Sequence, residues 1–164
     1  FIAANSLSAG CCAFSVMRYG NVVGSNGSVV PVFSRLLAAG KPLTLTDLRM
    51  TRFWITMDQA IDFSFKCLNM MQRREIFIPK IPSIKITDLA KAFGTSSVTY
   101  TGIRPGEKLH ETLISTDEGR STCDLDTYYA IYPNIKTNMP DGWSYRSDDN
   151  DFLTIEQIKE TINA

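Results

Sequence analysis

The stretch Phe14-Ser15-Val16-Met17-Arg18-Tyr19-Gly20-Asn21 indicates the fold class of this chain. It begins as a short apolar run that stops at a glycine, which is the profile of a buried strand. Glycines recur in the loop that follows, so the backbone there can approach a ligand closely. A helix pattern then extends from Ser28 to Gly40. This order of strand, glycine-rich loop and helix predicts a ligand crevice at the carboxyl end of a sheet.

Strands and helices alternate along the rest of the chain, which predicts an α/β protein. The helix at 56–71 opens with a capping box and is expected to bury a single apolar stripe. Pro105 is well placed to begin a helix that carries His110, and residues 115–150 are expected to be largely irregular. The expected stripe consists of Ile61, Phe65 and Leu68. Further strands are predicted at 43–45, 50–55, 75–79 and 98–101, and further helices at 87–93 and after Thr154.

Length and charge exclude several classes of protein. The chain has 164 residues, of which 44% are hydrophobic, and this is enough to bury a core. Lys plus Arg number 17, as do Asp plus Glu, so no overall field favours nucleic acid or an anionic membrane. Any anion site must therefore come from local placement of arginines. No stretch approaches the roughly 20 apolar residues that a membrane helix needs.

The cysteines predict neither a metal site nor a disulfide. The four are Cys11, Cys12, Cys67 and Cys123, without the C-x-x-C spacing of metal ligands. Adjacent cysteines are a poor disulfide pair, so reduced thiols in a cytoplasmic protein are expected. The chain also begins in the middle of a helix pattern, at Phe1, and is expected to be part of a longer protein.

Asn21 is the first candidate for ligand binding. It follows a predicted strand, and its amide both donates and accepts, so it can orient a phosphate or sugar oxygen. A simple turn is the alternative interpretation, because Asn and Gly favour turns in any case.

Arg52 is the second candidate. In a strand it shares a face with Trp54, where the indole could support the guanidinium or line a pocket. The alternative is an ordinary surface arginine on an edge strand.

The third candidate is the segment Arg104-Pro105-Gly106-Glu107. The forked cation of Arg104 matches phosphate, and a helix start would add backbone N–H groups. Glu107 could accept from ribose hydroxyls. The alternative is a capped helix with a local Arg–Glu pair. His110, the one histidine, could be a general acid or base, but a lone helical histidine is more often a packed or surface residue.

Three segments, 18–25, 51–56 and 102–108, together resemble the back half of the inverting UDP-N-acetylglucosamine 4,6-dehydratases. These are nucleotide-sugar enzymes of the extended short-chain dehydrogenase/reductase superfamily, in bacterial polysaccharide and glycan synthesis. The resemblance covers nearly the whole chain. It implies one partial unit over residues 1–164, in which the last Rossmann-type strands interleave with a small α/β substrate domain. The N-terminal cofactor-binding half is expected to be absent, and the chain has no Gly-x-Gly-x-x-Gly turn.

The resemblance also implies site residues. In the family, hydride leaves C4 of the sugar to NADP⁺, water is eliminated across C5 and C6, and hydride returns at C6 with inversion at C5. The Tyr-x-x-x-Lys-like region that moves protons is expected upstream of Phe1, so no catalytic residue is assigned here. Asn26 stands where the family usually has arginine. The UDP moiety is expected to meet Asn21, Val29, Thr46, Arg52, Arg104 and Glu107. The nicotinamide part of NADP is expected to meet Val22, Val23, Gly24, Ser25 and Asn26.

Two other functions remain open at this point. A related UDP-sugar epimerase would share the UDP contacts. A non-catalytic nucleotide-sugar-binding module would need only these contacts and no catalytic residues. The resemblance further implies a UDP-sugar partner, no nucleic acid, and a homo-oligomer when the protein is complete.

Overall fold

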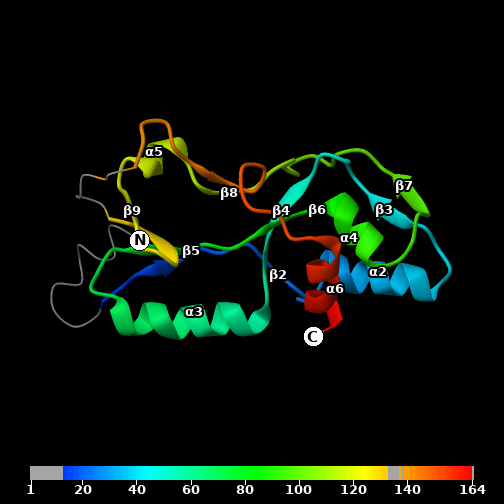
Figure 1. Ribbon diagram of the computed structural model, residues 1–164, viewed down its shortest axis with the longest axis horizontal. Coiled ribbons are helices and arrows are strands. Elements are labelled where there is room, and N and C mark those ends of the chain that lie inside the picture. Colours follow the sequence, from blue (N-terminus) through cyan, green and yellow to red (C-terminus); the bar gives the residue numbers. More distant parts are fainter. Residues whose placement is uncertain (1–12, 133–136, 138, 164) are drawn as a thin grey trace. The chain divides into compact units, whose positions relative to one another are not determined.

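Figure 1 shows the computed structural model of the chain, which describes residues 13–132, 137 and 139–163. The chain divides into two compact units, each built from separate stretches of sequence. We call them the sheet unit and the pocket unit. That they form one partial unit stays a prediction. The sheet unit comprises the described residues up to Tyr19, Asp58–Lys80 and Thr112–Tyr145; the pocket unit comprises Gly20–Met57, Ile81–Glu111 and the described residues from Arg146 onward.

A four-stranded sheet forms the centre of the sheet unit. Its strands lie in the order β1 (Val16–Met17), β5 (Ile76–Pro79), β10 (Tyr128–Ile131) and β9 (Thr122–Asp124). β1 is parallel to β5, whereas β10 is antiparallel to both of its neighbours. The apolar run of β5 suits this interior position, because a strand with neighbours on both sides is shielded from water. The predicted α/β class is confirmed.

Helix α3 (Met57–Met70) buries a different face from the one that the sequence predicted. Its predicted stripe is exposed, by 45% at Ile61 and by 63% at both Phe65 and Leu68. Both faces carry apolar side chains at helical spacing, so the period alone could not choose between them. The sheet decides the matter, because Phe77 of β5 belongs to the same apolar cluster as the buried face. The buried residues of α3 are Ala60, Phe63 and Cys67.

The segment after residue 111 is also more regular than predicted. Besides β9 and β10 it contains β8 (Thr112–Ile114), α5 (Thr116–Gly119) and β11 (Tyr145–Arg146). A full capping box starts α5: Ser115 Oγ accepts from the Glu118 N–H, and the Glu118 carboxylate accepts from the Ser115 N–H. This Ser-x-x-Glu signature could have predicted the helix.

The pocket unit contains two small sheets and three helices. One sheet has the order β2 (Asn21–Val22), β4 (Thr51–Ile55) and β6 (Ser83–Lys85); in the other, β3 (Leu43–Leu45) pairs with β7 (Val98–Tyr100). The helices are α2 (Val29–Ala38), α4 (Ile86–Ala92) and α6 (Ile155–Asn163). Their inner faces enclose one core. Its most deeply buried residues include Phe33, Leu43, Leu45, Met50, Ile84, Leu89 and Ile158.

Two local features fit the sequence closely. Gly20 lies against Phe53 of β4, where any Cβ atom would clash, so only glycine allows β2 to follow at this distance. A reciprocal cap begins α6: the Thr154 N–H donates to Gln157 Oε1 at 2.9 Å, and the Gln157 N–H donates to Thr154 Oγ1 at 3.3 Å. The predicted start of the last helix is therefore confirmed.

The helix predicted at Pro105 is absent, and residues 101–111 are irregular, with a turn at Pro105–Gly106. Gly102 and Gly106 adopt φ angles of 80° and 81°, in the left-handed region that a right-handed helix cannot contain. The His110 side chain is likewise held by another segment rather than by a helix. Among the described residues, no helix is long and apolar enough to cross a membrane.

Candidate functional site

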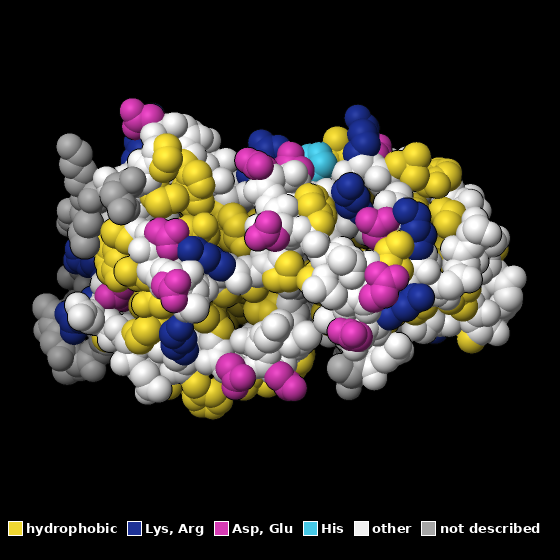
Figure 2. Space-filling model, in the orientation of Figure 1, with side chains coloured by type: hydrophobic (Ala, Val, Ile, Leu, Met, Phe, Trp, Pro, Cys, Tyr) yellow, Lys and Arg dark blue, Asp and Glu magenta, His cyan; other side chains and the backbone are white. Residues whose placement is uncertain are grey.

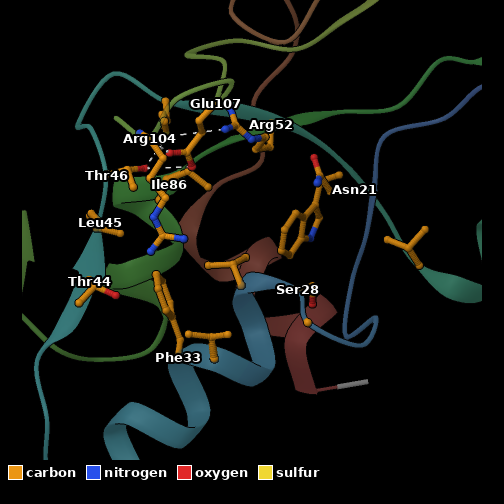
Figure 3. Close-up of a pocket in the computed structure, with 16 residues that line it drawn as sticks. Asn21, Ser28, Phe33, Thr44, Leu45, Thr46, Arg52, Ile86, Arg104 and Glu107 are labelled. Carbon is orange, nitrogen blue, oxygen red and sulfur yellow. Dashed lines mark hydrogen bonds between the residues drawn. The ribbon is translucent and has the colours of Figure 1, made fainter. Parts of the chain in front are cut away.

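A pocket of about 360 Å³ opens within the pocket unit (Figure 3). Its walls come from β2, the start of α2, β3, β4, the first residue of α4 and the turn at 104–107. Apolar side chains form much of the lining, and sequence reasoning did not assign them to the site: Val32, Phe33, Leu45, Met50 and Ile86. The indole of Trp54 also lines the pocket, which is one of the two roles expected for it.

The structure brings together all the residues that were expected to meet UDP. Each of them lines this one pocket, although they come from stretches far apart in the sequence: Asn21, Val29, Thr46, Arg52, Arg104 and Glu107. Of the residues expected to meet the cofactor, Val22 lines the pocket, whereas Val23, Gly24, Ser25 and Asn26 do not. The ligands themselves stay predictions.

Glu107 is fixed by the turn in which it lies. Its Oε2 accepts from the N–H of Arg104 at 3.2 Å, and its own N–H donates to the Arg104 carbonyl at 3.0 Å. Thr46 Oγ1 lies 3.4 Å from the other carboxylate oxygen, Oε1, which places the hydroxyl and carboxylate side by side in Figure 3. The arrangement presents an acceptor at the pocket wall that is suited to hydroxyl groups.

Arg104 has an uncommitted side chain. Its guanidinium makes no hydrogen bond or ion pair with the described part of the chain, and in Figure 3 it extends into the pocket. The chain's net charge is zero, so attraction for an anion in this pocket must come from local cations. A free guanidinium provides a forked pair of donors for a phosphate group.

Arg52, in contrast, is engaged with protein atoms. Nη1 donates to the carbonyl oxygens of Thr51 at 2.7 Å and Leu109 at 3.0 Å. Nη2 donates to the carbonyl of Lys108 at 2.9 Å, and Nε lies 3.7 Å from Glu111 Oε1. The side chain is only 13% exposed. Arg52 therefore holds the 108–111 segment against β4 while it lines the pocket, and its direct contact with a ligand stays a prediction.

A hydrogen-bond cluster beside Arg52 holds the same segment. Thr51 Oγ1 lies 2.9 Å from His110 Nδ1 and 2.7 Å from Ser147 Oγ. Ser147 Oγ accepts from the Glu111 N–H at 2.9 Å, and the Ser147 N–H donates to the Glu111 carbonyl at 2.9 Å. His110 thus has the packed role that was one of its two interpretations. Sequence reasoning missed Thr51 and Ser147, because residues 96 positions apart give no local signal.

Asp148 lies near the outer nitrogen of the His110 ring. The carboxylate Oδ2 is 3.9 Å from His110 Nε2 and 2.8 Å from Nη2 of Arg146. The hydrogen bond from Arg146 lowers the pKa of Asp148, so this carboxyl is ionised at neutral pH. Both residues are partly exposed, and neither lines the pocket.

The sequence predicted a Tyr-x-x-x-Lys-like region only upstream of Phe1, but one such spacing occurs within the chain, from Tyr132 to Lys136. Tyr132 directly follows β10, and its N–H donates to the Ser121 carbonyl at 2.9 Å. Burial raises its pKa, which opposes a role as a proton-transferring phenolate. Lys136 lies outside the described residues. Tyr132 therefore continues the pairing of β10 with the segment that leads into β9, and no catalytic role is assigned to it.

The two described cysteines are free thiols, and no disulfide joins them. Burial raises the pKa of Cys67 to about 11, so this thiol stays protonated and unreactive at neutral pH. Cys11 and Cys12 lie outside the described residues. The described residues contain no group of three or more His, Cys, Asp or Glu that could hold a metal ion.

Comparisons with known proteins show the family of the chain. A family model described as polysaccharide biosynthesis protein matches residues 1–133. UDP-N-acetylglucosamine 4,6-dehydratase (inverting) of Campylobacter jejuni serotype O:2 is 45% identical over 184 aligned residues, which cover 99% of this chain and 55% of the relative. The chain thus spans about half the length of the curated relatives it matches.

Solved structures confirm the predicted Rossmann-type α/β fold. The X-ray structure of Pen from Bacillus thuringiensis matches with a TM-score of 0.86 at 28% identity, over 98% of this chain and 52% of that one. The dTDP-glucose 4,6-dehydratase of Bacillus anthracis, in complex with NAD, matches with a TM-score of 0.54. At 14% identity, over 91% of this chain and 43% of that one, this second likeness shows the fold alone.

Proposed function

Because the chain belongs to the polysaccharide biosynthesis protein family, we propose that its pocket binds the UDP end of UDP-N-acetylglucosamine for an inverting 4,6-dehydratase. One observation carries the proposal. The six residues expected to meet UDP come from separate stretches of the chain, and all of them line a single pocket.

The pocket residues divide the work of binding. The free guanidinium of Arg104 holds the diphosphate, and the Asn21 amide orients one of its oxygens. The Glu107 carboxylate, which is held in place by the Arg104 N–H, accepts hydrogen bonds from the ribose hydroxyls. Arg52 keeps the neighbouring segment in place through the carbonyls of Lys108 and Leu109. The apolar lining excludes water and strengthens these charged contacts.

The proposal includes NADP as the nicotinamide cofactor, with residues 22–26 facing its nicotinamide part. The loop suits such a group: Gly24 has a φ of 72°, and apart from its two chain neighbours no residue comes within 4 Å of the place that a Cβ would occupy. The Val23 N–H donates to the Ile55 carbonyl at 2.9 Å and fixes the loop to β4. When bound, the cofactor supplies hydride exchange with the sugar. We also propose that the complete protein is a homo-oligomer and lies in the cytoplasm.

Titration of the full chain with UDP and with uridine tests the binding site. Hydrogen bonds to charged groups contribute about 1.5–3 kcal/mol each, so Arg104→Ala should weaken UDP binding by about ten- to a hundred-fold. Uridine, which lacks the diphosphate, should bind both proteins alike. Arg104→Lys should restore only part of the affinity, because an ammonium lacks the fork.

Arg49→Ala is the matched control, since Arg49 is exposed, pairs with Asp47 and does not line the pocket. It should leave UDP affinity unchanged. Equal UDP affinity in Arg104→Ala and the unaltered chain would count against the diphosphate site and reassign Arg104 to the turn itself.

A further inference from the structure

Two buried hydroxyl groups of the pocket unit belong to residues that do not line the pocket. Thr51, on β4, is 4% exposed, and Ser147, just after β11, is fully buried. Their oxygens lie 2.7 Å apart. Thr51 Oγ1 also contacts the ring of His110. Ser147 Oγ accepts from the N–H of Glu111. The two side chains therefore join three separate stretches of the chain.

Every proton in this cluster has an acceptor. Each hydroxyl carries one proton. Ser147 can donate to Thr51 Oγ1 at 2.7 Å, and Thr51 can then donate to His110 Nδ1 at 2.9 Å. The proton of the neutral His110 ring is then on Nε2, the nitrogen that faces the carboxylate of Asp148. Removal of either hydroxyl breaks this chain and leaves buried polar atoms unpaired, which is costly.

The segment after β11 is itself anchored to β6. The side-chain amide of Asn150 donates to Ser83 Oγ at 2.9 Å. The Ser83 N–H donates to the Asp151 carbonyl at 2.8 Å, and the Leu153 N–H donates to the Ser83 carbonyl at 2.9 Å. These bonds hold the segment at several successive positions. Ser147 is therefore a fixed point to which other parts of the unit can be tied.

The turn that carries Arg104 and Glu107 depends on its two ends. At one end, the Thr101 N–H donates to a carbonyl of β3 at 2.9 Å. At the other end lies the 108–111 segment. Between these ends, the one hydrogen bond from the turn to other described residues is the 3.4 Å contact of Thr46 with Glu107. A turn with so few bonds to its surroundings takes its position from its ends.

We propose that Thr51 and Ser147 are positioning residues for the nucleotide-sugar pocket. They contact no ligand, because neither lines the pocket. Their hydroxyls fix the 108–111 segment, and this segment in turn holds Arg104 and Glu107 at the pocket wall. The inference rests on the proposed function, and it makes UDP affinity depend on two side chains outside the pocket.

A double-mutant cycle tests whether Thr51 acts through Arg104. The UDP affinity of the full chain is measured by equilibrium titration for Thr51→Val, Arg104→Ala and the double variant. Valine keeps the branched shape of threonine but has no hydroxyl. Thr51→Val should weaken UDP binding by about five-fold, a common level of coupling within one network. In the Arg104→Ala background the same change should cost about two-fold or less, because the side chain that it misplaces is already gone.

Three further variants separate positioning from a general loss of stability. Thr51→Ser restores the hydroxyl and should bind UDP within about two-fold of the unaltered chain. Ser147→Ala should weaken UDP binding as Thr51→Val does, and it replaces Thr51→Val in the cycle if that variant does not fold. Thr122→Val is the matched control, since Thr122 of β9 is fully buried and its hydroxyl donates to the Glu118 carbonyl at 2.8 Å. It should lower the melting temperature without changing UDP affinity.

The outcomes separate this inference from the proposed function. Equal losses of UDP affinity in Thr51→Val and Thr122→Val would overturn the inference, because instability alone would explain both. An equal effect of Thr51→Val in the two backgrounds would also overturn it, since Thr51 would then act independently of Arg104. Unchanged affinity in Thr51→Val and Ser147→Ala, with a clear loss in Arg104→Ala, would overturn this inference alone. Unchanged affinity in Arg104→Ala would overturn the proposed function itself.

Discussion

At the scale of the residue, the two arginines of the pocket differ in what their guanidinium groups contact. Arg52 is surrounded by carbonyl oxygens of the 108–109 segment, whereas Arg104 makes no side-chain bond within the described chain. A saturated guanidinium stabilises the fold, and a free one is available to a ligand. The same residue type therefore serves stability in one place and recognition in the other.

This difference predicts opposite effects on stability. Arg52→Ala leaves the carbonyls of Lys108 and Leu109 without their donor, and should lower the free energy of unfolding by about 1–3 kcal/mol. Arg104→Ala should leave it unchanged, because no protein contact is lost. Urea denaturation of both variants measures this. If Arg104→Ala proved as destabilising as Arg52→Ala, the division between the two arginines would be incorrect.

Glu75 predicts how stability depends on pH. Burial raises its pKa, but hydrogen bonds from Ser15 Oγ and from the N–H groups of Arg73 and Gln72 outweigh burial and hold the pKa below its usual value. A lowered folded-state pKa means that the unfolded chain binds the proton more tightly. The stabilisation is therefore full above the unfolded pKa of about 4.3 and is lost as the pH falls through the folded value.

Unfolding free energies measured from about pH 6 to pH 3 should show this loss. In Glu75→Gln the protein should be less stable at neutral pH and its stability should depend less on pH over that range. Glu118, whose pKa is also lowered, contributes through its pair with Arg18, so a residual slope is expected in the variant. An unchanged slope would show that Glu75 is not a source of the acid sensitivity.

At the scale of the element, α3 carries apolar side chains both on the face that it buries and on the face that it exposes. Figure 2 shows hydrophobic atoms at the surface over α3, with acidic side chains beside them. The exposed members are Met57, Ile61, Phe65 and Leu68. These four large apolar side chains lie together on one face of α3 and form a patch rather than scattered exposure.

Substitutions on the two faces of α3 should therefore differ sharply. Phe63→Ala removes a side chain that is only 9% exposed and should cost about 3–5 kcal/mol of stability. Phe65→Ser alters a side chain that is 63% exposed and should cost far less, while it lowers the binding of a hydrophobic dye. Chemical denaturation and dye fluorescence measure the two effects. Equal destabilisation by both substitutions would show that Phe65 is covered in solution.

At the scale of the whole molecule, the chain contains the residues proposed to bind UDP, but no residue in it is assigned to the chemical reaction. The pocket gathers the residues proposed for UDP, but the chain has no Gly-x-Gly-x-x-Gly turn to hold a dinucleotide pyrophosphate. Its one Tyr-x-x-x-Lys spacing begins at the end of a strand. The chain spans about half the length of its curated relatives, which leaves room for those groups elsewhere in such proteins.

We therefore expect this chain by itself to bind UDP without catalysing dehydration. Incubation of the purified chain with UDP-N-acetylglucosamine and NADP⁺ should yield no 4-keto-6-deoxy product, while UDP binding remains measurable by titration. The Arg104→Ala chain controls for binding through the pocket. Turnover above background would show that the residues present here suffice for the chemistry.

The sequence by itself determined the features that depend on neighbouring residues. The α/β alternation, the start of α6 at Thr154 and a strand within residues 50–55 were predicted, because caps and periodicity are local. Gly20 was placed correctly in a loop after the first strand for the same reason. Six residues that line the pocket were named in advance from the family resemblance.

Only the tertiary structure decided which of several local possibilities is used. The sheet selected Phe63 over Phe65 as the buried face of α3, and left-handed glycines replaced the expected helix at Pro105 by an irregular segment. The bond between Thr51 and Ser147 joins residues that no local pattern connects. The burial of a side chain and the number of hydrogen bonds that it makes depend on its surroundings in space, so only the folded structure shows them.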